Sequence, residues 1–364
     1  MKVPKITAVE ISQDGLLVAF ELVHKPELFS WRWLQDHSQD LTRFDNVTKQ
    51  RKIDTFTIDP LVHGVRATID GDLVQVTWSD HSEPGQFPTR LLAQVAGLGN
   101  MESPSNDRSR RITFDEVVST DQGLSTWLND VANFGYGLVH DTPQSSTGFE
   151  TLARRIGYPR QTIFGDIWNL SSEVMEHSDS AYSRTFLEPH TDGTYSRDAP
   201  GLQMFCCLER EGSGGESVLV DGLATAEQLR RTDNAAFEIL TRIDVRSHYV
   251  EPGIHLSAQR PVIRLNRVGR VEQISFNNYD RAPFRLSLSE ENDFYSAYSK
   301  FHELLNDRNS WTVLRLEPGD ALLFDNWRML HGRMEYFGKR VFVGCYHNRE
   351  DFESRRRVLQ DQLS

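Results

Sequence analysis

The stretch Phe324-Asp-Asn-Trp-Arg-Met-Leu-His-Gly-Arg333 decides the fold, together with His190-Thr191-Asp192 far upstream. His190 is followed by Asp192 two residues later, and His331 comes 139 residues after that aspartate. Each motif adjoins a short apolar segment that is typical of a β-strand. The spacing therefore predicts many short strands that bring distant polar side chains together, as a barrel-like β-sandwich does.

Two imidazoles and one carboxylate can bind one face of Fe(II) and leave the opposite positions open for a chelating cosubstrate and O2. Arg340, nine residues after His331, begins an apolar segment, and a guanidinium binds carboxylates through two parallel hydrogen bonds. The alternative for Arg340 is a surface ion pair with Glu335 or Glu350. These residues predict a non-haem iron centre that uses a dicarboxylic acid as cosubstrate.

The triplet His-x-Asp is weak evidence by itself, because a chain with 12 histidines contains such triplets by chance. The segments 177–179, His-Ser-Asp, and 81–83, His-Ser-Glu, fit as well. The context of His190 differs, since an expected strand at 202–208 follows it and leads into Gly-Gly-Glu-Ser (214–217). We therefore predict that His190, Asp192 and His331 are the metal ligands and the catalytic centre.

Length and composition exclude several classes of protein. The chain has 364 residues, 38% of them hydrophobic, which is enough for a sizeable core. A formal net charge of −12 argues against a nucleic-acid partner. We expect a cytoplasmic protein without a membrane partner, because no apolar run approaches the ~18 residues of a membrane span and the N-terminus has no signal-peptide pattern. The three cysteines lie in expected core strands and predict free thiols.

A polar, turn-prone segment at 97–111 predicts a linker between two domains. Residues 1–96 predict a small β-rich N-terminal domain, and residues 112–364 predict a mostly β catalytic domain with flanking helices, a double-stranded β-helix or jelly roll. Helices are expected at 126–133, 148–156 and 294–305. Strands are expected at 8–11, 16–22, 66–72, 73–78, 137–140, 202–208, 217–220, 271–276, 311–316, 321–324 and 341–346.

The segment from about residue 124 to the C-terminus resembles the γ-butyrobetaine and trimethyllysine dioxygenase family of 2-oxoglutarate- and Fe(II)-dependent oxygenases. The resemblance rests on His-Thr-Asp (190–192), Pro-Gly-Leu-Gln (200–203), Gly-Gly-Glu-Ser (214–217), Val-Asp-Gly (220–222), Phe-Asn-Asn (276–278) and the stretch 325–333. Residues 29–38 resemble the family's small N-terminal domain more weakly. The resemblance implies a homodimeric hydroxylase in which His190, Asp192 and His331 bind iron, while Arg340 and Ser217 bind the distal carboxylate of 2-oxoglutarate.

In the family a quaternary ammonium lies in an aromatic cage, and the matching positions are Phe164, Trp168, Tyr182 and Tyr346. Phe164 stands where the family has a tyrosine, but the loss of a hydroxyl leaves the negative face of the ring. A single aromatic residue is more often part of the core than of a cage. The four together imply a small zwitterionic trimethylammonium acid as substrate.

The head group of the substrate is predicted from Asp179, which matches an asparagine that binds the substrate carboxylate in γ-butyrobetaine dioxygenases. An ionised aspartate repels a carboxylate, whereas a phosphonate monoanion can donate its proton to Asp179 while Asn277, Asn278 or Arg281 binds the other oxygens. The leading hypothesis is therefore 2-(trimethylammonio)ethylphosphonate, hydroxylated next to phosphorus in phosphonate catabolism, a reaction known from a related branch. If Asp179 instead faces solvent or an arginine, γ-butyrobetaine hydroxylation to carnitine is the alternative.

The family's zinc site, three cysteines and a histidine, corresponds here to Ser38, Asp40, Arg43 and His81. Serine, aspartate and arginine cannot form a tetrahedral thiolate site, so we predict no structural zinc.

Two other classes of protein stay open at this level. A cupin-type metal-dependent hydrolase or isomerase could use the same ligands but has no use for Arg340. A betaine-binding protein needs the aromatic cage but not the metal ligands.

Overall fold

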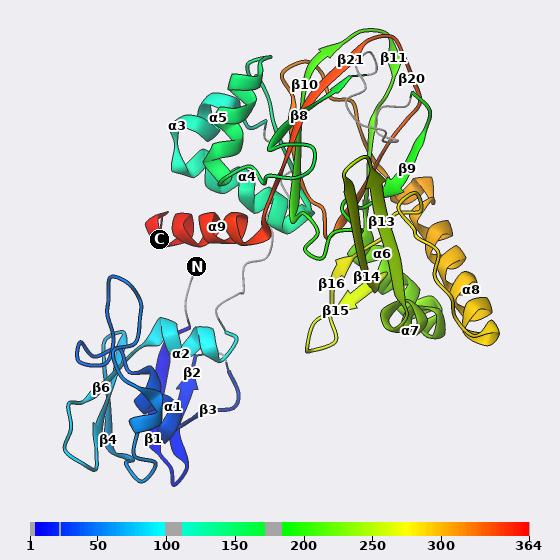
Figure 1. The fold of residues 1–364 in the computed structure, drawn as a ribbon. Coiled ribbons are helices and arrows are strands. Elements are labelled where there is room, and N and C mark those ends of the chain that lie inside the picture. The colour runs from blue at the N-terminus through cyan, green and yellow to red at the C-terminus, as the bar shows by residue number, and fades with distance from the viewer. Residues whose placement is uncertain (1–3, 22, 99–110, 172–183, 364) are drawn as a thin grey trace. The chain divides into compact units, whose positions relative to one another are not determined.

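The computed structural model describes residues 4–21, 23–98, 111–171 and 184–363 (Figure 1). The chain separates into two compact units, Met1–Asn106 and Asp107–Ser364. Most of the expected linker at 97–111 lies outside the described residues.

The first unit contains two three-stranded antiparallel sheets and short helices. Every second residue of β5 (Leu73–Trp78) is fully buried, namely Val74, Val76 and Trp78, as expected for a strand with one face on the core. The other strands are β1 (Ile6–Ile11), β2 (Gly15–Phe20), β3 (Glu27–Ser30), β4 (Gly64–Asp70) and β6 (Gly85–Pro88), with helices α1 (Trp31–His37), η1 (Thr55–Thr57) and α2 (Thr89–Val95).

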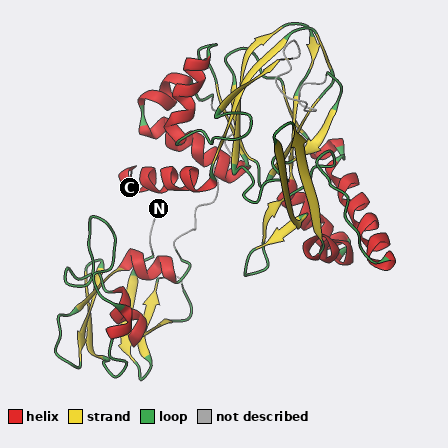
Figure 2. Cartoon of the chain, viewed as in Figure 1, coloured by secondary structure: helices red, strands yellow, loops and turns green. Residues whose placement is uncertain are grey.

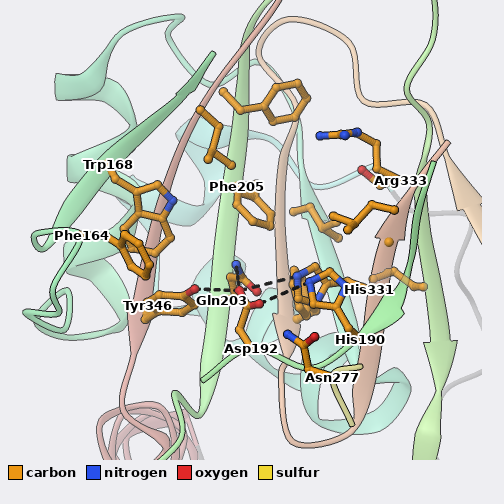
Figure 3. Close-up of a pocket in the computed structure, with 18 of the residues that line it drawn as sticks. Phe164, Trp168, His190, Asp192, Gln203, Phe205, Asn277, His331, Arg333 and Tyr346 are labelled. Carbon is orange, nitrogen blue, oxygen red and sulfur yellow. Dashed lines mark hydrogen bonds and ion pairs between the residues drawn. The ribbon is translucent and has the colours of Figure 1, made fainter. Parts of the chain in front are cut away.

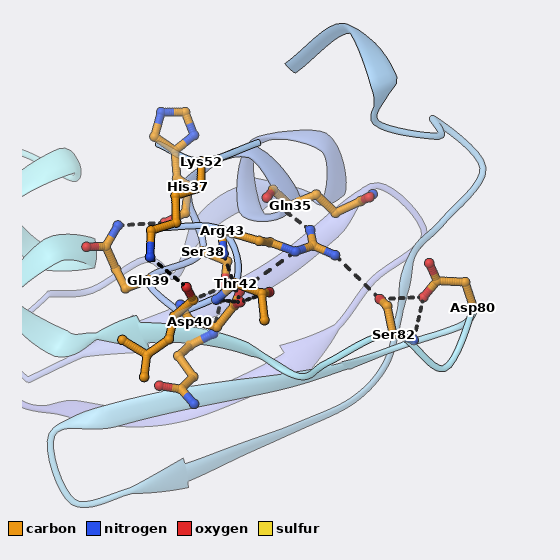
Figure 4. Close-up of polar contacts among 12 residues, drawn as sticks. Gln35, His37, Ser38, Gln39, Asp40, Thr42, Arg43, Lys52, Asp80 and Ser82 are labelled. Atoms are coloured by element: carbon orange, nitrogen blue, oxygen red, sulfur yellow. Dashed lines mark hydrogen bonds and ion pairs between the residues drawn. The ribbon is translucent and has the colours of Figure 1, made fainter. Parts of the chain in front are cut away.

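A polar group around the buried Ser38 and Asp40 follows α1, and we call it the Asp40 cluster (Ser38, Asp40, Thr42, Arg43; Figure 4). The Asp40 carboxylate accepts hydrogen bonds from the hydroxyls of Ser38 (2.7 Å) and Thr42 (2.5 Å) and from the backbone N–H of Arg43 (3.2 Å). The Arg43 guanidinium lies 3.7 Å from Asp40 and donates to the backbone carbonyl of Gln35. Three of the four positions that match the family's zinc site thus form a satisfied hydrogen-bond network.

The second unit is built on two antiparallel sheets (Figures 1 and 2). The five-stranded sheet has the order β7 (Tyr136–Val139), β18 (Ala321–Asp325), β10 (Leu202–Arg210), β21 (Arg340–His347) and β8 (Ile167–Ser171). The four-stranded sheet has the order β17 (Thr312–Leu314), β12 (Ser217–Asp221), β19 (Met329–Arg333) and β9 (Leu187–His190). Neighbouring strands are far apart in sequence, so the sheets bring distant motifs side by side.

Helices cover the outer faces of the two sheets (Figure 2). Side chains alternate along β12, so Val218 and Val220 contact the helices while Leu219 faces the other sheet. The five-stranded sheet packs against α3 (Phe114–Ser119), α4 (Asp121–Phe134), α5 (Ser146–Ile156) and α9 (Arg349–Leu363). The four-stranded sheet packs against α6 (Gly222–Thr232), α7 (Asn234–Arg242) and α8 (Leu288–Leu305).

The same alternation points a second set of side chains into the space between the sheets. On β10, Met204 and Cys206 pack on the helical side, so Gln203 and Phe205 face inward. Because these strands are buried on both faces, they read as continuous apolar runs, and the strands expected at 202–208, 217–220, 321–324 and 341–346 are all present.

Helix ends were harder to predict than strands. α8 begins six residues before the expected 294, because its first turn is polar and is stabilised by a capping box between Ser287 and Glu290. The helix expected at 126–133 likewise begins earlier, after the N-cap Thr120, and ends at Gly135 with φ 84°.

Some elements were placed wrongly or missed. The strand expected at 271–276 is β16 (Val271–Ile274), which pairs with β15 (Ile263–Leu265), and the strand expected at 311–316 shrinks to β17. The sequence did not predict the hairpin of β13 (Asp244–Glu251) and β14 (Ile254–Pro261), nor the short pair β11 (Ser213–Gly214) and β20 (Tyr336–Phe337).

All three cysteines are buried free thiols, as predicted. Within the described ranges, no helix combines the length and the apolar character that a membrane span requires.

Candidate functional site

Three predicted residues meet on the inner face of the four-stranded sheet (Figure 3). His190 ends β9 and pairs directly with His331 on β19, so their rings lie 4.4 Å apart between centroids. Asp192 follows His190, and its Oδ1 lies 3.4 Å from His190 Nε2 while its Oδ2 lies 3.7 Å from His331 Nε2. One ligand atom from each residue lies within 4.8 Å of the others, so the three can hold a single metal ion.

The protonation states of His331 and Asp192 suit a divalent cation. Burial by itself would lower the pKa of His190, but the contact with Asp192 outweighs it and raises this pKa, so His190 must release any proton on Nε2 to bind a metal. Burial and the nearby His190 lower the pKa of His331 to about 3, which leaves its ring neutral. Burial by itself would raise the pKa of Asp192, but His331, His190 and the Tyr346 hydroxyl outweigh it and lower this pKa. His190 Nδ1 lies 2.8 Å from the carbonyl oxygen of Glu188, and Nε2 on the other side of the ring faces Asp192, where it would be free to bind a metal.

Two residues that the sequence did not single out surround Asp192. Gln203 donates a hydrogen bond to Asp192 Oδ2 (2.8 Å), and the Asn326 side chain bonds both the backbone N–H (2.9 Å) and the carbonyl (3.1 Å) of Asp192. Both lie in motifs on which the family resemblance rests, Pro-Gly-Leu-Gln and Asp-Asn-Trp. Their place in these motifs was the only indication in the sequence that Gln203 and Asn326 belong to the site.

Arg340 lies at a basic part of the same cavity, which Ser217 and Arg333 also line. The carbon at the centre of the Arg340 guanidinium lies 3.8 Å from the centroid of the Phe342 ring, and its buried Nε has no hydrogen-bond partner among the described residues. No described carboxylate lies within 4.0 Å of it, so the ion pair with Glu335 or Glu350 is not formed. Burial and the nearby Arg333 lower the pKa of Arg340 to about 10, so it stays charged at neutral pH.

Arg333 was not predicted as a site residue. It is buried, lies directly opposite Ser217 across β12 and β19, and lines the cavity near Arg340. A second arginine at this end strengthens the attraction for a dicarboxylic acid. Its only sequence signal was its place two residues after His331.

The Gly-Gly-Glu-Ser motif shapes the turn that leads to Ser217. Gly214 and Gly215 have φ angles of 76° and 72°, and a Cβ atom on Gly214 would lie 2.1 Å from the carbonyl oxygen of Glu335. Only glycine fits such a backbone, so the motif sets where β12 begins and brings Ser217 to the cavity.

The predicted cage residues Phe164, Trp168 and Tyr346 line the cavity on the side of Asp192 away from Arg333 (Figure 3). Ring centroids are 6.5 Å apart for Phe164 and Trp168 and 4.4 Å apart for Trp168 and Tyr346. Tyr195 also lines the cavity and was missed, although it lies close to His190 in sequence. Tyr182 lies outside the described residues.

The structure separates the predicted head-group residues. Asn277 lines the cavity and donates to Asp280 Oδ2 (3.0 Å), another lining residue that the sequence did not suggest. Asn278 is exposed, and Arg281 lies against the rings of Tyr295 (5.6 Å) and Tyr298 (5.1 Å), so neither lines the cavity. Asp179 lies outside the described residues.

Known proteins similar to this chain agree with this geometry. Residues 98–346 match the family described as taurine catabolism dioxygenase TauD, TfdA family. The chain belongs to this family. It is 31% identical over 351 residues to the mitochondrial trimethyllysine dioxygenase of Bos taurus, covering 91% of this chain and 82% of that protein. It is 32% identical over 316 residues to the gamma-butyrobetaine dioxygenase of Pseudomonas sp., covering 83% and 82%.

Among solved structures, the PvcB protein of Pseudomonas aeruginosa superposes with a TM-score of 0.47 at 16% identity, over 62% of this chain and 80% of that chain. Membership of the TauD/TfdA family makes the protein a 2-oxoglutarate-dependent non-haem iron dioxygenase, which confirms the predicted Fe(II), 2-oxoglutarate and O2. The hydrolase, isomerase and binding-protein alternatives are thereby excluded.

Proposed function

We propose that this TauD/TfdA dioxygenase hydroxylates an aliphatic C–H bond of a small zwitterionic trimethylammonium acid. One observation carries the proposal: a single cavity holds the His190, Asp192 and His331 triad, with aromatic rings on one side and Arg333 on the other (Figure 3). Two relatives are named for the trimethylammonium compounds trimethyllysine and gamma-butyrobetaine, which supports this substrate class.

With iron bound, the site would use O2 as oxidant: 2-oxoglutarate would be decarboxylated to succinate and CO2, and one oxygen atom of O2 would enter succinate and the other the hydroxyl group of the product. His190, Asp192 and His331 would hold the iron, because their donor set suits Fe(II). Arg340, Ser217 and Arg333 would bind the distal carboxylate. The cosubstrate fits here, since the buried Arg340 Nε lacks a described protein partner and a carboxylate would satisfy it.

The aromatic side chains select and orient the substrate. Phe164, Trp168 and Tyr346 offer ring faces to a trimethylammonium group, which has no N–H to donate to a hydrogen-bond acceptor. Because the cage and the triad share one cavity, a cation held there places its carbon chain toward the metal ligands. This positioning converts an encounter into a near-unimolecular step and keeps water away from the reacting bond.

For the head group we propose 2-(trimethylammonio)ethylphosphonate as the leading substrate and γ-butyrobetaine as the alternative. The negative charge of Asp179 favours a phosphonate monoanion, which can donate its proton to this carboxylate. A second carboxylate, that of Asp280, lines the cavity beside Asn277. Arg281 and Asn278 do not line the cavity, which leaves Asn277 to donate to the remaining oxygens. The 32% identity to a gamma-butyrobetaine dioxygenase supports the alternative.

The test measures succinate formed by the Fe(II)-loaded enzyme with 2-oxoglutarate, O2 and each compound in turn. We expect a higher kcat/KM for the phosphonate, and a shift toward γ-butyrobetaine in the variant Asp179→Asn. Equal or better turnover of γ-butyrobetaine by the unmodified enzyme would overturn the phosphonate assignment. If neither compound increases succinate formation, the trimethylammonium class itself is wrong.

We also infer that residues 112–364 form a jelly-roll catalytic domain, whose two walls are the five- and four-stranded sheets, and that residues 1–96 form a separate small domain. The homodimer implied by the family resemblance is testable by light scattering of the purified protein.

A further inference from the structure

We propose that Gln203 and Tyr346 are positioning residues that hold Asp192 with Oδ1 toward the metal, and that Tyr346 thereby couples substrate binding to metal binding. The proposal rests on the proposed function, in which Asp192 is a metal ligand and Tyr346 belongs to the cage. It explains why the Pro-Gly-Leu-Gln motif places its glutamine at the cavity.

The hydrogen bonds of the Asp192 carboxylate are one-sided. Oδ2 accepts from Gln203 Nε2 at 2.8 Å and from the Tyr346 hydroxyl at 2.7 Å, whereas the nearest ring nitrogen to Oδ1 is His190 Nε2 at 3.4 Å. A carboxylate oxygen with two donors has its lone pairs engaged. Oδ1 is therefore the oxygen left to bind a cation, so the protein presents Asp192 as a ligand through one oxygen.

The two donors converge because of strand register. Gln203 on β10 and Tyr346 on β21 are direct partners in the antiparallel ladder, so their side chains point to the same face of the five-stranded sheet. Both side chains are nearly fully buried, at 2% and 6% exposure, so bulk water does not compete with Asp192 for their hydrogen bonds. Asp192 itself belongs to the opposite wall, since it follows β9, so this pair links the two sheets across the cavity.

A separate group fixes the backbone of Asp192. The side chain of Asn326 accepts from the Asp192 N–H at 2.9 Å and donates to the Asp192 carbonyl at 3.1 Å and to the Pro200 carbonyl at 2.9 Å. Asn326 therefore sets where the residue lies, and Gln203 and Tyr346 set how its carboxylate is turned. Loss of either donor should impair metal binding without unfolding the loop.

Tyr346 has a second contact that Gln203 lacks. Its ring lies 4.4 Å from that of Trp168, so the ring that carries the hydroxyl is also a wall of the proposed cage. A trimethylammonium group bound against the Tyr346 ring would restrict the motion of that ring. It would thereby order the Tyr346 hydroxyl that donates to Asp192. Because coupling between two ligands is reciprocal, substrate should tighten metal binding, and metal should tighten substrate binding equally.

The experiment measures Co(II) affinity of the metal-free enzyme under anaerobic conditions, by the d–d absorption of the bound ion, with and without γ-butyrobetaine as probe. We expect Gln203→Met and Tyr346→Phe each to weaken Co(II) binding about 10- to 100-fold, the range for lost outer-shell partners. The tightening caused by γ-butyrobetaine should persist in Gln203→Met and disappear in Tyr346→Phe, which keeps the aromatic ring.

Two controls separate positioning from packing. Tyr298→Phe and Gln273→Met alter buried residues of the same types that do not line the cavity, and they should bind Co(II) as the unmodified enzyme does. Unfolding midpoints of the metal-free variants identify any that merely fold poorly, and a poorly folded Tyr346→Phe leaves Gln203→Met to decide the positioning role.

Unchanged Co(II) affinity in both Gln203→Met and Tyr346→Phe would overturn the positioning role. Persistent coupling in a well-folded Tyr346→Phe would overturn the link to the cage. Failure of the proposed function looks different, because the unmodified enzyme would then bind Co(II) without any response to γ-butyrobetaine and would form no extra succinate with either compound.

Discussion

The Asp40 cluster and the residues around Asp192 are two polar groups of the same chain. They differ in how fully the protein satisfies the hydrogen-bonding capacity of the central carboxylate. Asp40 is buried, and both its oxygens accept hydrogen bonds from Ser38, Thr42 and the backbone. The Asp192 side chain is 21% exposed toward the cavity, and only its Oδ2 is fully engaged. A complete network stabilises a fold, whereas an incomplete one beside a cavity is prepared for a ligand.

The same contrast holds for the arginines of the two regions. Arg43 is bound to Asp40, to a backbone carbonyl and to Ser82, while the buried Arg340 has no described carboxylate near it. An unsatisfied buried donor costs about 1–3 kcal/mol, and a carboxylate bound at Arg340 would offset that cost.

The largest effect is expected for Asp192→Asn. Replacing the metal-binding carboxylate should lower Co(II) affinity and succinate formation by more than ~100-fold, because outer-shell changes alone cost ~10–100-fold. Metal titration and a 2-oxoglutarate decarboxylation assay measure both quantities. Metal affinity like that of the unmodified enzyme would show that Asp192 is not a ligand.

A smaller loss is expected for Arg340→Met, which removes the charged donor for 2-oxoglutarate. Hydrogen bonds to charged groups contribute about 1.5–3 kcal/mol, so the KM for 2-oxoglutarate should rise roughly 10- to 100-fold. Steady-state kinetics with varied 2-oxoglutarate test this. Arg315→Met, which removes an exposed arginine paired with Glu317, is the matched control and should leave that KM unchanged.

Trp168→Leu should weaken binding of the trimethylammonium group while leaving 2-oxoglutarate binding intact. One lost cation–π contact corresponds to about 0.5–2 kcal/mol, or roughly a 2- to 30-fold rise in substrate KM. An analogue of γ-butyrobetaine with an uncharged tert-butyl group in place of trimethylammonium controls for shape. An equal loss of affinity for both compounds would mean that Trp168 acts by packing and not by its π-face.

The smallest effect on catalysis is expected for Asp40→Asn, the same chemical change made in the complete cluster. An amide cannot accept all the hydrogen bonds that the carboxylate accepts, so unfolding should become easier by about 1–3 kcal/mol. Urea unfolding followed by tryptophan fluorescence measures this, since Trp78 lies close to Arg43. Succinate formation per folded enzyme should not change, and a large loss of activity would contradict a purely structural role.

Several features could be predicted from sequence because they depend on residue type and local pattern. The apolar runs predicted the inner strands, and the histidines and aspartate predicted the metal-binding set that β9 and β19 bring together. Helix starts were less predictable, because capping by Thr120 or Ser287 involves only one or two polar side chains.

Other features depended on how the chain turns after a strand. Arg281 was expected near the substrate, but the strand ends at Ile274 and the chain then pairs at Arg281 with Ser247 of β13. Its guanidinium consequently lies over Tyr295 and Tyr298 of α8. A hairpin that the sequence did not reveal thus removed a predicted ligand from the cavity.

The sequence by itself determined the chemistry of this protein, because iron binding by two histidines and an aspartate needs particular side chains, and their identity is visible in any chain. Only the tertiary structure decided how those side chains are aimed. The register of β10 against β21 places Gln203 beside Tyr346, and both donate hydrogen bonds to Asp192 Oδ2. Hydrogen bonds between strands distant in sequence have no local signature, since their geometry exists only once the two sheets have packed together.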